Sequence, residues 1–270
     1  MQPIHKFPKD IAKNITCVFT DIDDTLTTEG SLPACAYNAL EALTKAGIHV
    51  APITGRPAGW CDMIARLWPV AGVVGENGAF YFSYDRDQKK MIRAYDTDEL
   101  TRASDRKRLD NIAARILTEV PGCAISVDQT FRDTDLAIDI AEDVPELDEP
   151  SVLRIKEIFE EEGAVAKVSS IHVNGWYGTY SKLTMSRRFA IERLGLDVDS
   201  RKENFVFCGD SPNDGSMFEF FPFACGVANV KQFEGKMPSY PAFVSEKKGG
   251  EGFVEIAEIL LKARCVKVGV

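Results

Sequence analysis

The chain has 270 residues, with 32 basic and 41 acidic side chains and a formal net charge of −9. This acidic balance argues against a nucleic-acid binder, whose affinity rests largely on basic contacts to phosphates. No apolar run approaches the roughly 18 residues of a membrane span, and charged residues interrupt the N-terminal stretch, so we expect neither a membrane helix nor a signal peptide. Length and an apolar fraction of 45% indicate one large folded domain or two unequal ones.

Cysteine and histidine usage narrows the chemistry further. The seven cysteines are odd in number and widely spaced, and no C-x-x-C occurs, so neither a disulfide framework nor a zinc site is expected. None of the three histidines has the partner spacing of a metal or triad motif. We therefore expect a protein of the reducing cytoplasm.

The first third of the chain alternates strand and helix signals. Apolar, β-branched runs predict buried strands, and apolar residues at helical spacing predict the helices between them. Pro52 counts against the second strand, because proline has no N–H for the ladder. This order with short loops predicts a parallel sheet with helices on both faces. The expected elements are a strand over Ile15–Thr20, a helix over Pro33–Ala46, a strand over His49–Thr54, a helix over Pro57–Leu67 and a strand over Gly72–Gly75.

The middle of the chain, from about Tyr84 to Gly175, carries more charge and a different pattern. It predicts a second α+β unit inserted into the first, which gives a core of residues 1–84 plus 176–270 and an insertion of residues 85–175. The expected elements are helices over Thr97–Val120 and Val152–Glu162 and strands over Ile125–Asp128, Ala137–Ala141, Ala164–Val168 and Ile171–Val173.

The last part returns to the alternating pattern of the first. The pattern predicts helices over Lys182–Leu194, Asn213–Phe220 and Gly252–Lys262, and strands over Asn204–Cys208 and Phe223–Val227.

Acidic residues follow two of the buried strands directly. Asp21 and Asp23 come after the first strand, and Asp210 and Asp214 after the strand that ends at Cys208. Ligands of open parallel sheets bind at the carboxyl ends of the strands, so the four acids are expected to converge. Two like charges about 4 Å apart repel by roughly 4 kcal/mol at an effective dielectric of 20, so such a cluster needs a cation. Oxygen-only ligands suit Mg²⁺.

A lysine and a hydroxyl complete the pattern. Lys182 heads a predicted helix, where its charge opposes the helix dipole unless an anion binds beside it. Thr54 ends a predicted strand and is followed by Gly55 and Arg56. Acids, Mg²⁺, a lysine and a hydroxyl suit a phosphoryl group: one carboxylate can attack phosphorus, and another can protonate the departing alcohol and then activate water.

The run from Asp21 to Thr27, Asp-Ile-Asp-Asp-Thr-Leu-Thr, resembles the D-x-D-x-T motif of the haloacid dehalogenase superfamily of phosphatases. Thr54 in Ile-Thr-Gly-Arg-Pro is similar to the second motif, Lys182 to the third, and Gly-Asp-Ser-Pro-Asn-Asp, residues 209–214, to the fourth. The run Gly-Glu-Asn-Gly-Ala over residues 75–79 also resembles this branch. The resemblance implies a Rossmann-like core with an inserted α/β cap of the C2 type, as in Cof-type and sucrose-phosphate phosphatases.

The resemblance also implies roles at the matching positions. Asp21 would be the nucleophile and a Mg²⁺ ligand, and Asp23 the general acid/base with its backbone carbonyl on Mg²⁺. Asp210 would bind Mg²⁺, and Asp214 would bind it directly or through water. The residues around the phosphate would be Thr54, Gly55, Lys182 and Asn213. Asp24 departs from the pattern, since many relatives have glycine there, and its role stays open. No motif of the cap can be matched.

Simpler interpretations exist for single residues. Asp21 and Asp23 alone could form a turn, and Lys182 alone could be a solvated helix residue. Arg56 is interpreted as a surface residue or a residue at the rim of the site, with substrate contact possible. Asn174 is a modest candidate for substrate contact, whereas His172 is interpreted as structural.

The predicted function is a Mg²⁺-dependent phosphatase acting on a small phosphorylated metabolite, foremost a sugar phosphate, with no nucleic-acid or membrane partner. A phosphomannomutase-like phosphomutase is the first alternative, because Gly175-Trp-Tyr-Gly-Thr-Tyr-Ser-Lys182 loosely resembles the third-motif region of those enzymes. A receiver-type phospho-accepting module is the second, although receivers are about half this length and lack an insertion. P-loop kinase chemistry is not expected, since no G-x-x-x-x-G-K-[ST] occurs.

Overall fold

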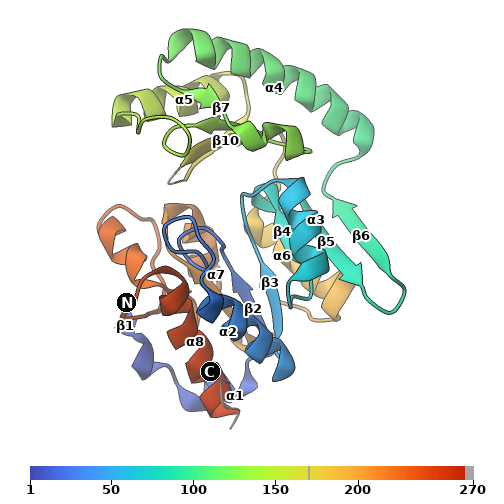
Figure 1. The fold of residues 1–270 in the computed structure, drawn as a ribbon, viewed down its shortest axis with the longest axis vertical. Helices are drawn as coiled ribbons and strands as arrows, with labels where there is room; N and C mark the ends of the chain where they lie inside the picture. The colour runs from blue at the N-terminus through green and yellow to red at the C-terminus, as the bar shows by residue number, and fades with distance from the viewer. Residues whose placement is uncertain (170, 265–270) are drawn as a thin grey trace.

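The computed structural model describes residues 1–169 and 171–264, and it folds into two bodies stacked one above the other (Figure 1). The larger body is built on a six-stranded parallel sheet of order β1-β13-β12-β11-β2-β3. Its strands are β1 Gln2–Pro3, β13 Phe243–Val244, β12 Cys225–Gly226, β11 Phe205–Gly209, β2 Cys17–Thr20 and β3 His49–Pro52. The predicted α/β class with a parallel sheet is thus confirmed.

Both faces of this sheet are buried, because its strands contribute alternate side chains to two apolar clusters. Val18 and Val206 pack on one side with helices α2 (Ala34–Lys45) and α8 (Gly249–Ala263). Phe19 and Phe207 pack on the other side with α6 (Lys182–Phe189) and α7 (Gly215–Phe220). The short helix α1 (Lys9–Asn14) contacts α8. This burial explains why β2 and β11 are continuous apolar runs rather than alternating ones.

Pro52 is compatible with strand β3 because its missing N–H is not needed there. His49 and Ile53 donate backbone hydrogen bonds to Thr16 and Thr20, so the odd-numbered residues of β3 face β2 as donors. Pro52 lies between these donors, and its nitrogen is directed away from β2. Pro52 is therefore no argument against strand β3.

A three-stranded antiparallel sheet extends the larger body beyond β3, to which Ile53 and Val74 connect it by a bridge. It consists of β4 Val73–Gly75, β5 Phe80–Asp85 and β6 Lys90–Tyr95, and helix α3 (Ala58–Leu67) packs against β4 and β5. The β5–β6 hairpin was not expected from the sequence. This hairpin crosses the boundary that the sequence predicted between residues 84 and 85, so the chain leaves the larger body only after Tyr95. The division into core and insertion stays a prediction.

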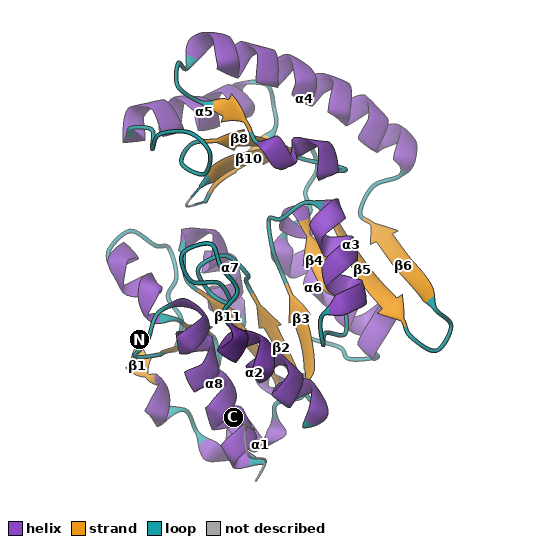
Figure 2. Cartoon of the chain, viewed as in Figure 1, coloured by secondary structure: helices purple, strands orange, loops and turns teal. Residues whose placement is uncertain are grey.

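The smaller body, which we call the cap, has helices on one side of a four-stranded antiparallel sheet of order β7-β8-β10-β9. Figure 2 shows α4 and α5 on the side away from the core, with the sheet toward it. Leu109, Ile138 and Phe159 belong to its own apolar cluster. The elements are α4 Glu99–Glu119, β7 Ala124–Ile125, β8 Leu136–Asp139, α5 Glu149–Glu161, β9 Val165–Val168 and β10 His172–Trp176.

Among the elements that the sequence predicted, the three largest differences are the following. The strand predicted over 125–128 ends at Ile125, because Asp128 turns inward to accept hydrogen bonds from Ser126 and Arg132, and a 3-10 turn, η3 Val127–Phe131, follows. The strand predicted over 223–227 is limited to β12. The helix predicted over 182–194 changes after α6 into a π-helical turn, η4 Ala190–Leu194, which ends at the left-handed Gly195.

Short 3-10 turns complete the chain: η1 Ile4–Lys6, η2 Glu76–Gly78, η5 Lys202–Asn204, η6 Pro212–Asp214 and η7 Ala228–Phe233. Within the described part of the chain, no helix is long and apolar enough to cross a membrane.

Candidate active site

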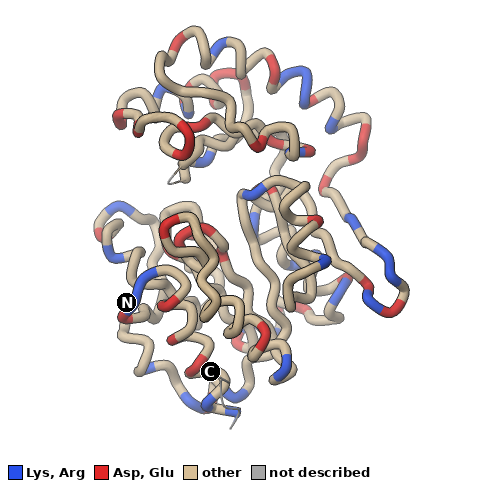
Figure 3. The backbone as a smooth tube through the Cα atoms, viewed as in Figure 1, with Lys and Arg blue, Asp and Glu red and all other residues tan. Residues whose placement is uncertain are grey.

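The acids that follow β2 and β11 converge, as the parallel sheet requires. The backbone N–H of Asp21 donates to the carbonyl of Cys208 at 2.8 Å, which holds the ends of these two neighbouring strands together. Carboxylate oxygens of Asp21, Asp210 and Asp214 all lie within 4.8 Å of one another, and all three residues are buried. Figure 3 shows acidic residues in the core loops that face the cap.

Lys182 lies between two of these acids. Its Nζ donates to Asp21 Oδ1 at 2.7 Å and to Asp214 Oδ1 at 2.9 Å. Ser181 caps helix α6 by accepting from the Thr184 N–H, so the helix begins directly at the lysine and directs it toward the strand ends. Burial alone would lower the pKa of Lys182, but Asp21 and Asp214 outweigh it and raise that pKa above its ordinary value. The lysine is therefore a permanent cation of the site.

The cluster holds more negative charge than one lysine can balance. Burial raises the pKa of Asp21 to about 7, against the attraction of Lys182, and burial together with Asp214 raises the pKa of Asp210 well above its ordinary value. Three carboxylates around one ammonium leave an excess of two negative charges, which is the charge that a divalent cation supplies. The donor set therefore fits Mg²⁺.

The three acids are not equivalent as ligands. Both oxygens of Asp214 already accept hydrogen bonds, Oδ1 from Lys182 and Oδ2 from the backbone N–H of Asp210 at 3.1 Å. Thr25 donates weakly to Asp210 Oδ1, at 3.4 Å. Asp21 and Asp210 therefore have more free coordination capacity than Asp214.

The candidate phosphate-binding residues surround the same acids. Gly55 and Asn213 line a pocket together with Asp21 and Asp210. Thr54 is fully buried beside it, where its Oγ1 accepts the N–H of Arg56 at 3.0 Å. A side chain at position 55 would press against the Asn77 amide, so the glycine keeps this wall of the pocket close to the backbone.

Arg56 is a buried residue of the site, with an exposed fraction of only 8%. Its Nε lies 3.1 Å from both Asp23 oxygens, its Nη2 2.8 Å from Oδ1, and its Nη1 3.1 Å from Glu142 of the cap. Glu142 Oε2 is in turn 2.9 Å from His172 Nε2. One arginine thus connects the candidate acid/base to the cap.

The cap contributes the opposite wall of the pocket, through Arg132, Ser169, Ile171, His172 and Asn174. Asn174 therefore reaches the site, although its amide donates to Asp135 at 2.9 Å. Arg132 was missed by the sequence analysis because, in a charged segment, it cannot be told from solvated arginines. In the structure it is buried between Asp128 and Asp135.

Asp24, where many relatives have glycine, lies outside the three-acid cluster. Its φ of 56° is left-handed, a conformation that glycine adopts without strain. Partial burial, and after it the charge of Asp23, raise the pKa of Asp24. The backbone conformation thus explains the glycine of the motif, and Asp24 fills its place at a cost in strain.

Several solved structures share the fold of this chain. Thermoplasma acidophilum 0175 matches with a TM-score of 0.69 at 18% identity, over 91% of this chain and 98% of that one. A sucrose-phosphatase from Synechocystis, solved with sucrose and phosphate, matches with a TM-score of 0.61 at 14% identity, over 92% and 98%. A sugar phosphatase of haloacid dehalogenase subclass IIB matches with a TM-score of 0.62 at 15% identity, over 92% and 98%. These likenesses define the fold class.

A family model described as haloacid dehalogenase-like hydrolase matches residues 18–119. That segment contains the first acidic run and Thr54. Over these residues the chain is similar to that family, in agreement with the resemblance of the first acidic run and of Thr54. No curated protein sequence matches the chain.

Proposed function

We propose that the protein is a Mg²⁺-dependent phosphatase that hydrolyses a small phosphomonoester of the sugar-phosphate class through an aspartyl-phosphate on Asp21. The observation that carries the proposal is Lys182 Nζ at 2.7 Å from Asp21 and 2.9 Å from Asp214, with Asp210 in the same cluster. An ammonium among three buried acids is suited to hold a phosphoryl group.

The metal would be held by the side chains of Asp21 and Asp210 and by the backbone carbonyl of Asp23. Mg²⁺ supplies positive charge that neutralises the phosphoryl oxygens when it is bound. Asp214, whose two oxygens already accept hydrogen bonds, would act through water and orient Lys182.

The chain's own residues then account for both half-reactions. A carboxylate oxygen of Asp21 bonds to phosphorus as the ester P–O bond breaks, and Asp23 gives the departing alcohol its proton. Water then attacks the phosphorus of the aspartyl-phosphate, losing its proton to Asp23, and the Asp21–phosphorus bond breaks. Throughout, Lys182, the Thr54 hydroxyl, the Gly55 N–H and the Asn213 amide would hold the phosphate oxygens.

The alcohol part of the substrate would face the cap. Arg132, His172 and Asn174 line that side of the pocket. The positive charge of Arg132 is balanced by Asp128 and Asp135. A neutral, hydroxyl-rich group suits such donors and acceptors better than a second anion. The solved neighbours that are named as sugar phosphatases support this choice.

The test is release of inorganic phosphate from a panel of hexose phosphates by the purified protein, with Mg²⁺ and with chelator. We expect turnover only with Mg²⁺. Isomerised sugar phosphate with little free phosphate would instead indicate the phosphomutase, and an aspartyl-phosphate that persists for hours would indicate the receiver-type module. Absence of turnover on the whole panel would contradict the proposal.

A further inference from the structure

The turn that connects β4 to β5 contacts three parts of the candidate active site: the phosphate-binding loop, the head of helix α6 and the cap. Its three residues, Glu76, Asn77 and Gly78, have consecutive positive φ values of 41°, 57° and 107°. Two of them are not glycine, so the turn is strained and must be held by its surroundings. What holds it is a set of contacts to the phosphate-binding loop, to helix α6 and to the cap.

Contacts on the core side are made by the backbone of the turn. Glu76 and Asn77 donate their N–H groups to the carbonyls of Arg56 and Thr54, at 3.2 and 3.1 Å. A Cβ on Gly78 would overlap the carbonyl of Ser181, the residue that caps the helix of Lys182. The turn thus fixes the phosphate-binding loop and the head of α6 at once.

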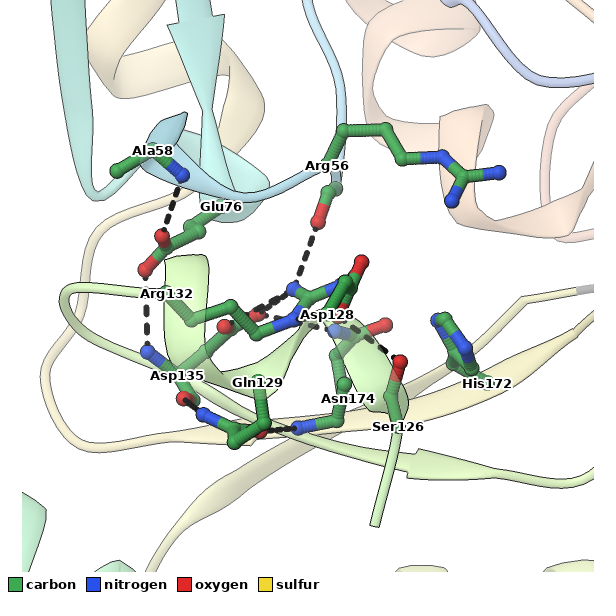
Figure 4. A network of polar contacts seen from close by, with 12 residues as sticks. Arg56, Ala58, Glu76, Ser126, Asp128, Gln129, Arg132, Asp135, His172 and Asn174 are labelled. Carbon is green, nitrogen blue, oxygen red and sulfur yellow. Dashed lines mark hydrogen bonds and ion pairs between the residues drawn. The ribbon is translucent and has the colours of Figure 1, made fainter. Parts of the chain in front are cut away.

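On the cap side, the Glu76 carboxylate is the contact. Although it belongs to the core and is fully buried, it accepts hydrogen bonds from three successive backbone N–H groups of the cap, those of Asp133 (2.9 Å), Thr134 (2.7 Å) and Asp135 (3.2 Å). The Thr134 hydroxyl is a fourth donor and the N–H of Ala58, at the start of α3, is a fifth, at 2.9 Å. Figure 4 shows the carboxylate between α3 and the cap loop.

This cap loop carries pocket residues. Arg132, its first residue, donates to the carbonyl of Gly55 at 3.0 Å and to Asp135 at 3.0 Å, and Asp135 accepts from Asn174. Arg132 and Asn174 both line the pocket. These two cap residues are therefore held relative to the phosphate-binding loop by the direct bond from Arg132 to Gly55 and by the loop that Glu76 binds.

We propose that Glu76 is a positioning residue, which anchors the cap loop 132–135 to the phosphate-binding loop 54–56 and so places Arg132 and Asn174 against the leaving group. The inference rests on the proposed phosphatase function for its kinetic part only. A buried carboxylate that loses its hydrogen-bond donors costs free energy. The donors of the cap loop and the Glu76 carboxylate therefore stay together unless the loop separates from the core.

The experiment uses the full chain and two variants of the anchor. Thr134→Val removes the hydroxyl donor with little change in shape, and Glu76→Gln places an amide nitrogen among N–H donors. Thr118→Val is the matched control, because Thr118 is exposed and its hydroxyl donates to the Ala114 carbonyl of its own helix. Glu76→Gln is the stronger perturbation and can unfold the chain, so Thr134→Val decides the outcome.

The first readout is backbone hydrogen exchange, which needs no enzymatic activity. We expect exchange at residues 133–135 to become at least about tenfold faster in Thr134→Val, since a charge-assisted hydrogen bond is lost, and to remain unchanged in Thr118→Val. Unchanged exchange at 133–135 in Thr134→Val would overturn the anchor, whatever reaction the protein catalyses.

The second readout separates positioning from loss of fold. In Thr134→Val we expect KM for a hexose phosphate to rise about tenfold, while kcat for p-nitrophenyl phosphate, whose leaving group needs little from the cap, stays within about twofold. Thr134→Ser should restore both exchange and KM. Equal losses with both substrates would show a merely structural role. An inactive parent protein would contradict the proposed function, and the exchange data would still decide the anchor.

Discussion

Arg56 holds the carboxylate of Asp23 with two of its nitrogens and reaches Glu142 of the cap with the third. The proposed general acid, Asp23, is therefore tied to Arg56, whose other partner, Glu142, belongs to the cap. For Asp23 to deliver a proton to the leaving oxygen, this ion pair has to loosen, so the contact can couple cap position to proton transfer.

Replacing Arg56 tests this coupling. Arg56→Lys keeps a positive charge but loses the fork that engages both Asp23 oxygens, so we expect kcat/KM to fall by about 10- to 100-fold without loss of fold. Steady-state kinetics with a hexose phosphate is the measurement. Arg66→Lys, on helix α3 and paired at the surface with Asp62, is the control. Unaltered kinetics in Arg56→Lys would show that the ion pair has no part in the reaction.

Replacing the proposed nucleophile removes the covalent route. Asp21→Asn keeps the size of the side chain and can still contact Lys182, so we expect a folded protein whose kcat is lower by at least about 10³-fold. Phosphate release together with thermal unfolding measures both properties. Full activity in this variant would assign the attack to another group.

Metal binding is expected to stabilise the protein as well as activate it. Mg²⁺ neutralises part of the cluster of Asp21, Asp210 and Asp214, and binding to the native state alone adds about 2.7 kcal/mol at 100 times the dissociation constant. We expect Mg²⁺ to raise the Tm, and Asp210→Asn to lose that shift. Asp10→Asn, at the exposed start of α1, should keep it. A shift of equal size in Asp210→Asn would exclude Asp210 as a ligand.

Glu142 predicts a pH dependence of stability. The hydrogen bond from His172, with the charges of Arg56 and His172, lowers the pKa of Glu142 from 4.5 to about 2 against partial burial. A carboxyl with a lowered native pKa stabilises the fold above its unfolded pKa, and that contribution is lost as the pH falls from about 4.5 toward 2. Urea unfolding of the parent and of Glu142→Gln should differ most above pH 5 and converge below it; a difference that grows on acidification would contradict the assignment.

Two glycines with positive φ allow the cost of backbone strain to be distinguished from the cost of steric overlap. Gly78 (φ 107°) has Ser181 against the place of a Cβ, whereas Gly122 (φ 93°) has open space there. Gly78→Ala should lower the free energy of unfolding by about 3 kcal/mol or more, from strain and overlap, and Gly122→Ala by only about 1–2 kcal/mol. Denaturant unfolding measures both. Equal losses would mean that the close approach to Ser181 is not rigid.

The sequence predicted the core strands β2 and β11 well. A strand that is buried on both faces is a continuous run of apolar residues, which is easily recognised in the sequence. It failed at the β5–β6 hairpin, where β6 alternates charged and apolar residues and its partner strand decides its conformation. It also failed beyond Ile125, because a side-chain network around Arg132 closes a turn that no local pattern reveals.

For the site, the sequence by itself predicted which residues would gather and which chemistry they suit. Asp21, Asp23, Asp210 and Asp214 were predicted to converge because acids directly after buried strands gather at one edge of a parallel sheet. Lys182 was predicted from its place at the head of a helix. Only the tertiary structure decided how these groups are paired. That Arg56 is buried on Asp23, and that Glu76 joins core to cap, depends on contacts between segments about 20 to 90 residues apart, which carry no periodicity in the chain.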